Sequence, residues 1–176
     1  MFDPTAFDNI KVVVEGAIYD KDLDGEVLVT KREDLVDLAN LSRAFNLAFS
    51  IVQSNKSDSY AEFKLRADLK NLASELLEMD HASTLAGCMV TIHFYLTHGN
   101  EEKIFLNIQK VLEDIWGKDR KIEQAVKINP LKRKDTIVNE AIVHFNRLVL
   151  EDQIEDLTEM IDYVVLTLKQ LENVIK

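Results

Sequence analysis

The chain contains little cysteine, proline or glycine, and each shortage excludes a class of structure. Its 176 residues include one cysteine, two prolines and five glycines. Because Cys88 stands alone, no intrachain disulfide and no zinc site built from several cysteines can form. The five glycines are too scattered for a glycine-rich phosphate loop, and the sequence lacks the G-x-S-x-G, Walker A and G-x-G-x-x-G motifs. We therefore predict no cofactor.

Long apolar runs and an excess of basic residues are missing as well. The longest apolar-rich run, LAGCMVTIHFYL over residues 85–96, is too short to span a bilayer. The first residues, MFDPTAFDNI, lack the basic and apolar regions of a signal peptide. The net charge of −10 disfavours nucleic-acid binding spread over the whole surface. These features predict a cytoplasmic protein with no membrane partner, for which nucleic acid is a disfavoured partner.

What the chain does contain favours helices. It is 47% hydrophobic and rich in residues with high helix propensity. We predict one domain over residues 1–176 that is mainly α, or α+β by strict count. In this prediction a β-hairpin over residues 10–31 packs on a bundle of six to seven helices over residues 32–176.

The hairpin contains an acidic turn that is similar to a calcium loop. The stretch DKDLDGEVLVTK places Asp20, Asp22 and Asp24 at alternate positions, as an EF-hand does. An EF-hand needs a glutamate at position 12, where this chain has Lys31. The flanking KVVVEGAIY and EVLVT are β-branched and predict strands instead of helices. We predict a solvated turn, and the three aspartates stay a weak metal candidate.

Apolar periodicity and capping residues predict the helices of the bundle. Their expected ranges are 32–53, 60–79, 101–116, 120–128, a stretch from about 135, and 152–175. Residues 85–96 fit either a strand or a helix, and Gly99 followed by Asn100 favours a buried helix. Residues 136–175 form either one bent helix or two, and a change in the phase of the apolar stripe favours a break near Asp152.

The last predicted helix carries the most regular apolar stripe. A helix of the chain's own core explains this stripe best, and the alternative is the interface of a homodimer or of a complex with another protein. The stripe consists of Ile154, Leu157, Ile161, Val164, Leu168, Leu171 and Ile175.

Residues 118–134 form a basic segment in an otherwise acidic chain. Seven basic side chains against two acidic ones give this segment a charge of +5. The segment is either a solvated connector, which we favour, or a binding site for an anion such as a phosphate or a nucleic-acid backbone. The candidate anion-binding residues are Lys118, Arg120, Lys121, Lys132, Arg133 and Lys134.

The histidines make a weak case for metal binding or catalysis. Glu78-x-x-His81 has the spacing used in di-iron bundles, but no matching second motif accompanies it. Cys88 lies in the most apolar segment, where a thiol is usually inert. If the protein is an enzyme, its site is assembled from distant residues, and His93 or His98 are the first candidates.

Together these observations predict a small non-enzymatic protein that acts by binding another protein or a second copy of itself. The first alternative is a regulator that binds an anion or a nucleic acid through residues 118–134. The second alternative is an enzyme with a site assembled from distant residues.

Overall fold

A computed structural model describes residues 5–52, 58–74, 84–131 and 135–176. The described part of the chain holds a six-stranded antiparallel sheet and four α-helices, so the prediction of a mainly helical bundle is wrong. In chain order the elements are α1 (Thr5–Leu23), β1 (Val27–Asp37), β2 (Ser42–Ile51), β3 (Tyr60–Ala67), α2 (Leu69–Ser74), β4 (Gly87–Gly99), α3 (Glu102–Trp116), β5 (Lys121–Lys127), β6 (Thr136–Leu150), the 3₁₀ turn η2 (Glu151–Gln153) and α4 (Ile154–Val174).

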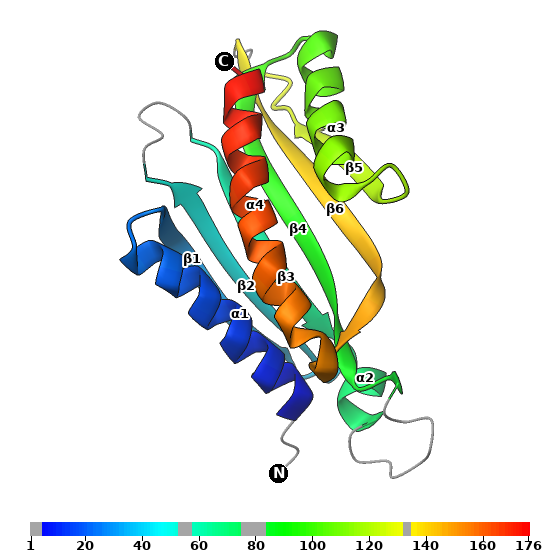
Figure 1. Cartoon of the computed structure of the whole chain (residues 1–176). Helices are drawn as coiled ribbons and strands as arrows, with labels where there is room; N and C mark the ends of the chain where they lie inside the picture. Colours follow the sequence, from blue (N-terminus) through cyan, green and yellow to red (C-terminus); the bar gives the residue numbers. More distant parts are fainter. Residues whose placement is uncertain (1–4, 53–57, 75–83, 132–134) are drawn as a thin grey trace.

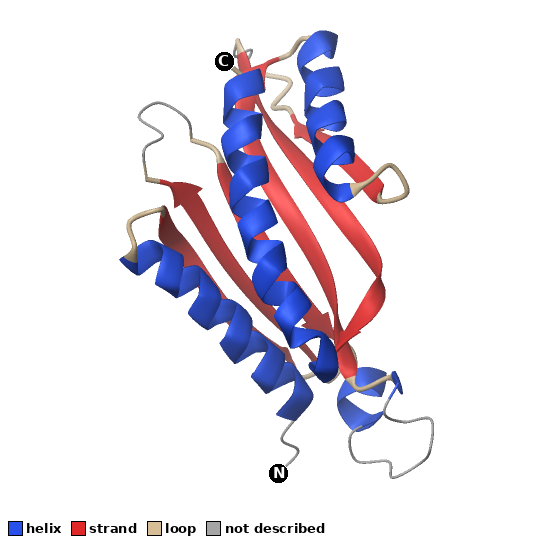
Figure 2. Ribbon diagram, in the orientation of Figure 1, coloured by secondary structure: helices blue, strands red, loops and turns tan. Residues whose placement is uncertain are grey.

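The fold has two layers, a sheet and a row of helices on one of its faces (Figures 1 and 2). The strand order is β1-β2-β3-β4-β6-β5, and every neighbouring pair is antiparallel. The long helix α4 crosses the centre of the sheet, with α1 on one side of it and α3 on the other (Figure 1). The hydrophobic core therefore lies between this row of helices and the sheet.

Alternation along β4 shows how the sheet divides into a covered and an open face. Val90, Ile92 and Phe94 are fully buried, while Thr91 and His93 between them are only half-buried. Successive side chains of a strand point to opposite faces, so the buried set lies under the helices. We call the opposite side the open face.

The predicted hairpin over residues 10–31 is wrong because its first half is helical. Phe7, Ile10, Val14 and Ile18 of α1 are all buried, and their spacing of three or four residues places them on one side of a helix. The β-branched residues of KVVVEGAIY suggested a strand, but the tertiary contacts of this helical stripe override that local propensity. Of the two predicted hairpin strands, only the second, EVLVT, is a strand in the structure, where it forms the beginning of β1 from Val27 onward.

Most of the predicted bundle helices are strands. Residues 32–37 lie in β1 and residues 42–51 in β2, residues 60–67 form β3, residues 121–127 form β5, and the stretch after 135 forms β6. In β2 the buried residues Phe45, Leu47, Phe49 and Ile51 recur every second position. This period of two is the strand signal, and a helix would spread these side chains around its circumference. Residues 85–96 also lie in a strand, from Gly87 onward, so the preference for a buried helix there is wrong.

Two predicted helices are confirmed. The helix α3 ends at Trp116, and Gly117 follows it with φ of 93° as its C-terminal cap. The helix α4 starts after η2, which confirms the break near Asp152. None of the helices in the described part of the chain is long and apolar enough to cross a membrane.

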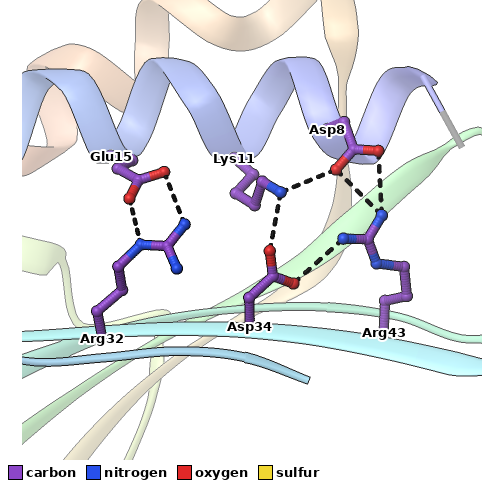
Figure 3. A network of polar contacts seen from close by, with 6 residues as sticks. All are labelled: Asp8, Lys11, Glu15, Arg32, Asp34 and Arg43. Atoms are coloured by element: carbon purple, nitrogen blue, oxygen red, sulfur yellow. Dashed lines mark hydrogen bonds and ion pairs between the residues drawn. The ribbon is translucent and has the colours of Figure 1, made fainter. Parts of the chain in front are cut away.

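An ionic network fastens α1 to the first two strands (Figure 3). Lys11 Nζ lies 2.9 Å from Asp34 Oδ2, and Arg43 Nη2 lies 3.1 Å from Asp34 Oδ1. Arg43 Nη1 also contacts both carboxylate oxygens of Asp8 at 3.0 Å. The network consists of Asp8, Lys11, Glu15, Arg32, Asp34 and Arg43. Three of these residues are basic and three are acidic, so the charges balance, which fits a structural role.

The charges around Asp34 lower its pKa. Burial by itself would raise the pKa of Asp34, but hydrogen bonds and ion pairs with Lys11 and Arg43 outweigh the burial. The folded state therefore prefers the ionised carboxylate more strongly than the unfolded chain does, so the ionised form stabilises the fold.

Candidate binding groove and open sheet face

A groove lies where α3 stops short and β6 continues. Because Gly117 ends α3, the chain turns back into β5 while β6 runs on to Leu150 below the first turns of α4 (Figure 1). The groove has a volume of about 270 Å³. Its lining residues come from the end of α3, the turn between α3 and β5, the C-terminal half of β6 and α4: Ile115, Trp116, Arg120, Phe145, Arg147, Asp156, Glu159, Met160 and Tyr163.

Three aromatic rings line the groove. The rings of Trp116 and Phe145 meet edge to face, with centroids 5.6 Å apart. The Tyr163 ring is tilted by 60° to Trp116 at 6.2 Å, and Tyr163 remains 50% exposed. These are favourable geometries for aromatic pairs, and a large exposed ring area remains for a ligand to bury. The groove thus combines a preformed apolar surface with access to solvent.

A bulge in β6 shapes the floor of the groove. The pairing of β4 with β6 shifts register between Met89 and Thr91, so that extra residues of β6 loop out around Asn146. Asn146 has φ of 51°, a left-handed conformation that asparagine tolerates better than most residues with a Cβ. Phe145 and Arg147, the neighbours of this residue, both line the groove. Bulges of this kind often redirect side chains next to functional sites.

Charged side chains form the rim of the groove. The Arg120 guanidinium lies 4.9 Å from the centroid of the Phe145 ring and donates to the Phe145 carbonyl at 3.4 Å. In the part of the chain that the structure describes, Arg147, Asp156 and Glu159 have no ion-pair partner. The groove can therefore offer charges of both signs to a ligand.

A second polar site, the open-face cluster, lies at the centre of the open face. We define it by Glu62, Lys64, Thr91, His93, Tyr95 and Glu140, which come from β3, β4 and β6. His93 Nδ1 contacts Glu140 Oε1 at 2.6 Å, and His93 Nε2 lies 3.2 Å from Thr91 Oγ1. The Tyr95 hydroxyl lies 2.8 Å from Glu140 Oε1, which joins the cluster into one network.

The environment of the open-face cluster shifts several pKa values. Burial lowers the pKa of His93, even though the hydrogen bond with Glu140 acts in the opposite direction. Burial would raise the pKa of Glu140, but its contacts with His93 and Tyr95 outweigh this and lower it. Burial and the neighbouring carboxylates raise the pKa of Tyr95. Near neutral pH these shifts favour a neutral imidazole beside an ionised carboxylate.

In the open-face cluster the His93 imidazole contacts the Thr91 hydroxyl on one side and the Glu140 carboxylate on the other. Nucleophilic catalysis uses the same sequence of groups. The members of the cluster project from strands of the sheet surface, and none of them lines the groove. Cross-strand polar pairs of this kind also stabilise exposed sheets without any chemistry. Catalysis would need a substrate cavity beside the imidazole as well.

The predicted anion-binding residues are not gathered into one patch by the described chain. Arg120 lines the groove, whereas Lys121 pairs with Glu123 at 2.6 Å. Lys118 is exposed in the turn between α3 and β5. The candidates Lys132, Arg133 and Lys134 lie outside the described residues. The anion site therefore stays a prediction.

The predicted interface stripe packs inside the chain itself. Five of its seven residues are fully buried on the side of α4 that faces the core: Leu157, Ile161, Val164, Leu168 and Leu171. The two residues at the ends of the stripe, Ile154 and Ile175, are partly buried against the same core. The structure uses the stripe to cover the sheet, so a partner would have to bind the chain elsewhere.

The weak metal candidate lies at the end of α1. Asp20 and Asp22 belong to the last turns of this helix, and Asp24 lies in the turn that leads to β1. Asp22 Oδ2 accepts a hydrogen bond from the Val29 backbone at 3.1 Å. Among the described residues, no group of three or more histidine, cysteine or acidic side chains is arranged to hold a metal ion. Glu78 and His81 lie outside the described residues.

The remaining predicted candidates sit apart from the groove. Cys88 is buried, and burial raises the pKa of its thiol to about 12, so it is a poor nucleophile. His98 is buried on the covered face, where Nδ1 lies 2.7 Å from the Gly99 carbonyl. Of the two histidines named as candidates for catalysis, only His93 belongs to a network with a carboxylate.

The groove was not predicted from the sequence. The one sequence signal for it is the lone tryptophan directly before Gly117, the residue expected to end α3. Phe145 and Tyr163 are far apart in the sequence, and only strand pairing and helix packing bring them to Trp116. Comparison with family models, curated proteins and solved structures gives no match.

Proposed function

We propose that the protein is a non-enzymatic interaction module that anchors a partner polypeptide in the groove between α3, β6 and α4. One observation carries this proposal: tryptophan, tyrosine, arginine and methionine side chains converge on a single groove. Aromatic residues, arginine and methionine are enriched in protein interfaces, and tryptophan, tyrosine and arginine dominate binding hot spots.

The composition of the groove favours binding over catalysis. Among the residues that the structure describes, its lining includes no histidine, cysteine, serine, threonine or lysine, the side chains that most often act as nucleophiles or bases. Its two carboxylates, Asp156 and Glu159, lie on the exposed side of α4. Exposed carboxylates of this kind are better suited to orienting a charged partner than to proton transfer.

A heterologous partner fits the structure better than a second copy of the chain. The stripe of α4 that suggested a homodimer is occupied by the chain's own core. A cytoplasmic protein partner remains our proposal, on the basis of the single cysteine and the acidic composition. Light scattering tests self-association directly, and a monomer at high micromolar concentration would exclude the homodimer.

The experiment compares Tyr163→Ala with Leu166→Ala in quantitative affinity capture. Both residues are exposed on α4, at 50% and 43%, but only Tyr163 lines the groove. The wild type and Leu166→Ala should capture equal amounts of partner. Tyr163→Ala should capture about tenfold less, as expected for the loss of a hot-spot side chain. The partner is then purified and its affinity measured for both variants. Equal binding by the two variants would contradict the proposal.

A second candidate function is anion binding, because Arg120 of the basic segment lines the same groove as Arg147. This hypothesis expects binding to labelled nucleic acid that weakens steeply with salt and is lost when Lys132, Arg133 and Lys134 are changed to glutamate. Binding that does not change with salt, or no binding, would exclude it.

A third candidate function is hydrolysis at the open-face cluster, favoured by the contacts of His93 with Thr91 and Glu140. Activity toward a panel of activated esters should then disappear in both His93→Gln and Thr91→Val. An equal residual rate in the wild type and the two variants would exclude this function.

A further inference from the structure

The two walls of the groove carry opposite charges that do not neutralise each other. Arg147 belongs to β6, while Asp156 and Glu159 project from the first turns of α4. No ion pair joins these residues across the groove in the described chain, because none of their nitrogen and oxygen atoms lies within 4.0 Å of an opposite charge. Both signs of charge are therefore open to a ligand.

The second arginine of the groove is less available than Arg147. The guanidinium of Arg120 is stacked on Phe145 and bonded to a backbone carbonyl. It therefore helps to build the floor, which leaves Arg147 as the open cation. The face of Phe145 is filled by this contact, so the rings that remain open to a ligand are Trp116 and Tyr163.

A ligand with a single charge fits this groove poorly. A cation would be attracted by the carboxylates of α4 but repelled by Arg147, and an anion would be attracted by Arg147 but repelled by these carboxylates. A ligand that carries both charges on an apolar body satisfies both walls and buries the open area of Trp116 and Tyr163. Like charges placed together are a common means of rejecting wrong partners, so the same rim provides specificity.

We propose that the groove recognises a partner segment in which an aromatic or aliphatic side chain lies between one basic and one acidic side chain. This inference rests on the proposed function and adds the chemistry of the partner. The apolar side chain packs on Trp116 and Tyr163, the basic one faces Asp156 and Glu159, and the acidic one faces Arg147.

The lone tryptophan provides a direct measurement of binding. Because Trp116 is the only tryptophan in the chain, its indole N–H gives one resonance in a ¹⁵N-correlated spectrum, which needs no further assignment. The full chain is titrated with capped tripeptides of matched size. Lys-Phe-Glu and Glu-Phe-Lys carry both charges in the two possible orders, Lys-Phe-Gln and Gln-Phe-Glu carry one, and Gln-Phe-Gln carries none.

At least one of the two doubly charged peptides should shift the Trp116 resonance at a concentration about tenfold below that needed for the neutral peptide. Arg147→Gln and Glu159→Gln should each reduce this preference for the doubly charged peptide over the neutral one by a factor of about three to five. Lys127→Gln and Glu155→Gln serve as matched controls, because both residues are exposed and neither lines the groove. The control variants should keep the full preference.

The outcomes separate this inference from the proposed function. If the neutral or a singly charged peptide binds as well as both doubly charged ones, the charge requirement is wrong while the groove remains a binding site. If no peptide shifts the resonance but Tyr163→Ala still loses its partner, the inference is overturned and the proposed function stands. If the resonance never shifts and Tyr163→Ala retains its partner, both are wrong.

Discussion

Replacement of Leu168 by alanine tests whether the apolar stripe of α4 belongs to the core of the single chain. The Leu168 side chain is fully buried between α4 and the rest of the core. Truncation of a buried leucine removes its transfer free energy and leaves a cavity, so we expect a loss of about 3–4 kcal/mol in the free energy of unfolding. For a chain of this length, that corresponds to a fall in melting temperature of about 6–16 °C.

The assay is urea-induced unfolding, followed by far-UV circular dichroism and Trp116 fluorescence at two protein concentrations about twentyfold apart. Leu166→Ala is the matched control, because Leu166 lies on the same helix but is 43% exposed, and its truncation should change the free energy by less than about 0.5 kcal/mol. A core stripe gives midpoints that do not depend on concentration. A loss below about 1 kcal/mol for Leu168→Ala, or a wild-type midpoint that rises with concentration, would refute the assignment to the monomer core.

Substitutions at four further positions test local features of the fold. A Cβ at Gly87 would lie 2.4 Å from the Val149 carbonyl oxygen, so Gly87→Ala should cost about 1–3 kcal/mol in thermal unfolding. In contrast, Gly16→Ala in α1 meets no atom within 4 Å and should stabilise by up to about 1 kcal/mol; equal effects at the two glycines would contradict the packing. The positive φ of Asn146 predicts that Asn146→Gly changes the free energy of unfolding by less than about 0.5 kcal/mol, whereas Asn146→Val costs about 1–2 kcal/mol; similar losses for both would argue against the bulge. For Asp34 the lowered pKa means that its stabilisation is complete above the ordinary value of 3.8 and is lost as the pH falls below it. Asp34→Asn should therefore cost about 1–2 kcal/mol at pH 7, and chemical denaturation near pH 2.5 should show a clearly smaller difference from the wild type; a difference that does not depend on pH would exclude the ionic network as its source.

Local signals in the sequence identified the helices α3 and α4 because their ends carry backbone chemistry that does not depend on the rest of the fold. Gly117 adopts the positive φ that ends α3, and the phase change near Asp152 corresponds to η2. The same reasoning failed at α1, where β-branched residues suggested a strand. There Phe7, Ile10 and Val14 have helical spacing, and their packing on the core, a tertiary contact, overrides the strand propensity of the β-branched residues.

The strands were missed for a related reason. Leu65 and Leu69 fit a helical stripe when they are counted four residues apart, yet β3 ends at Ala67 and α2 begins at Leu69. A short stretch can satisfy a period of two and a period of about 3.6 at once, and strand pairing then decides between them. Pairing is non-local: β4 joins β6, about 50 residues later in the chain, so its stabilisation cannot be judged from a window of sequence.

The candidate site shows the same division between sequence and structure. The acidic charge, the single cysteine and the lone tryptophan are features of the sequence, and the single cysteine excludes an intrachain disulfide without any structure. The groove exists only because α3 ends early, β6 bulges at Asn146 and α4 packs beside α3, which brings Trp116, Phe145 and Tyr163 together. The sequence by itself determined the charge, the chemistry that is missing and the ends of two helices, because these depend on residue type and local backbone preference. The sheet, the core role of α4 and the groove were decided only by tertiary structure, because each depends on contacts between residues that are distant in the sequence.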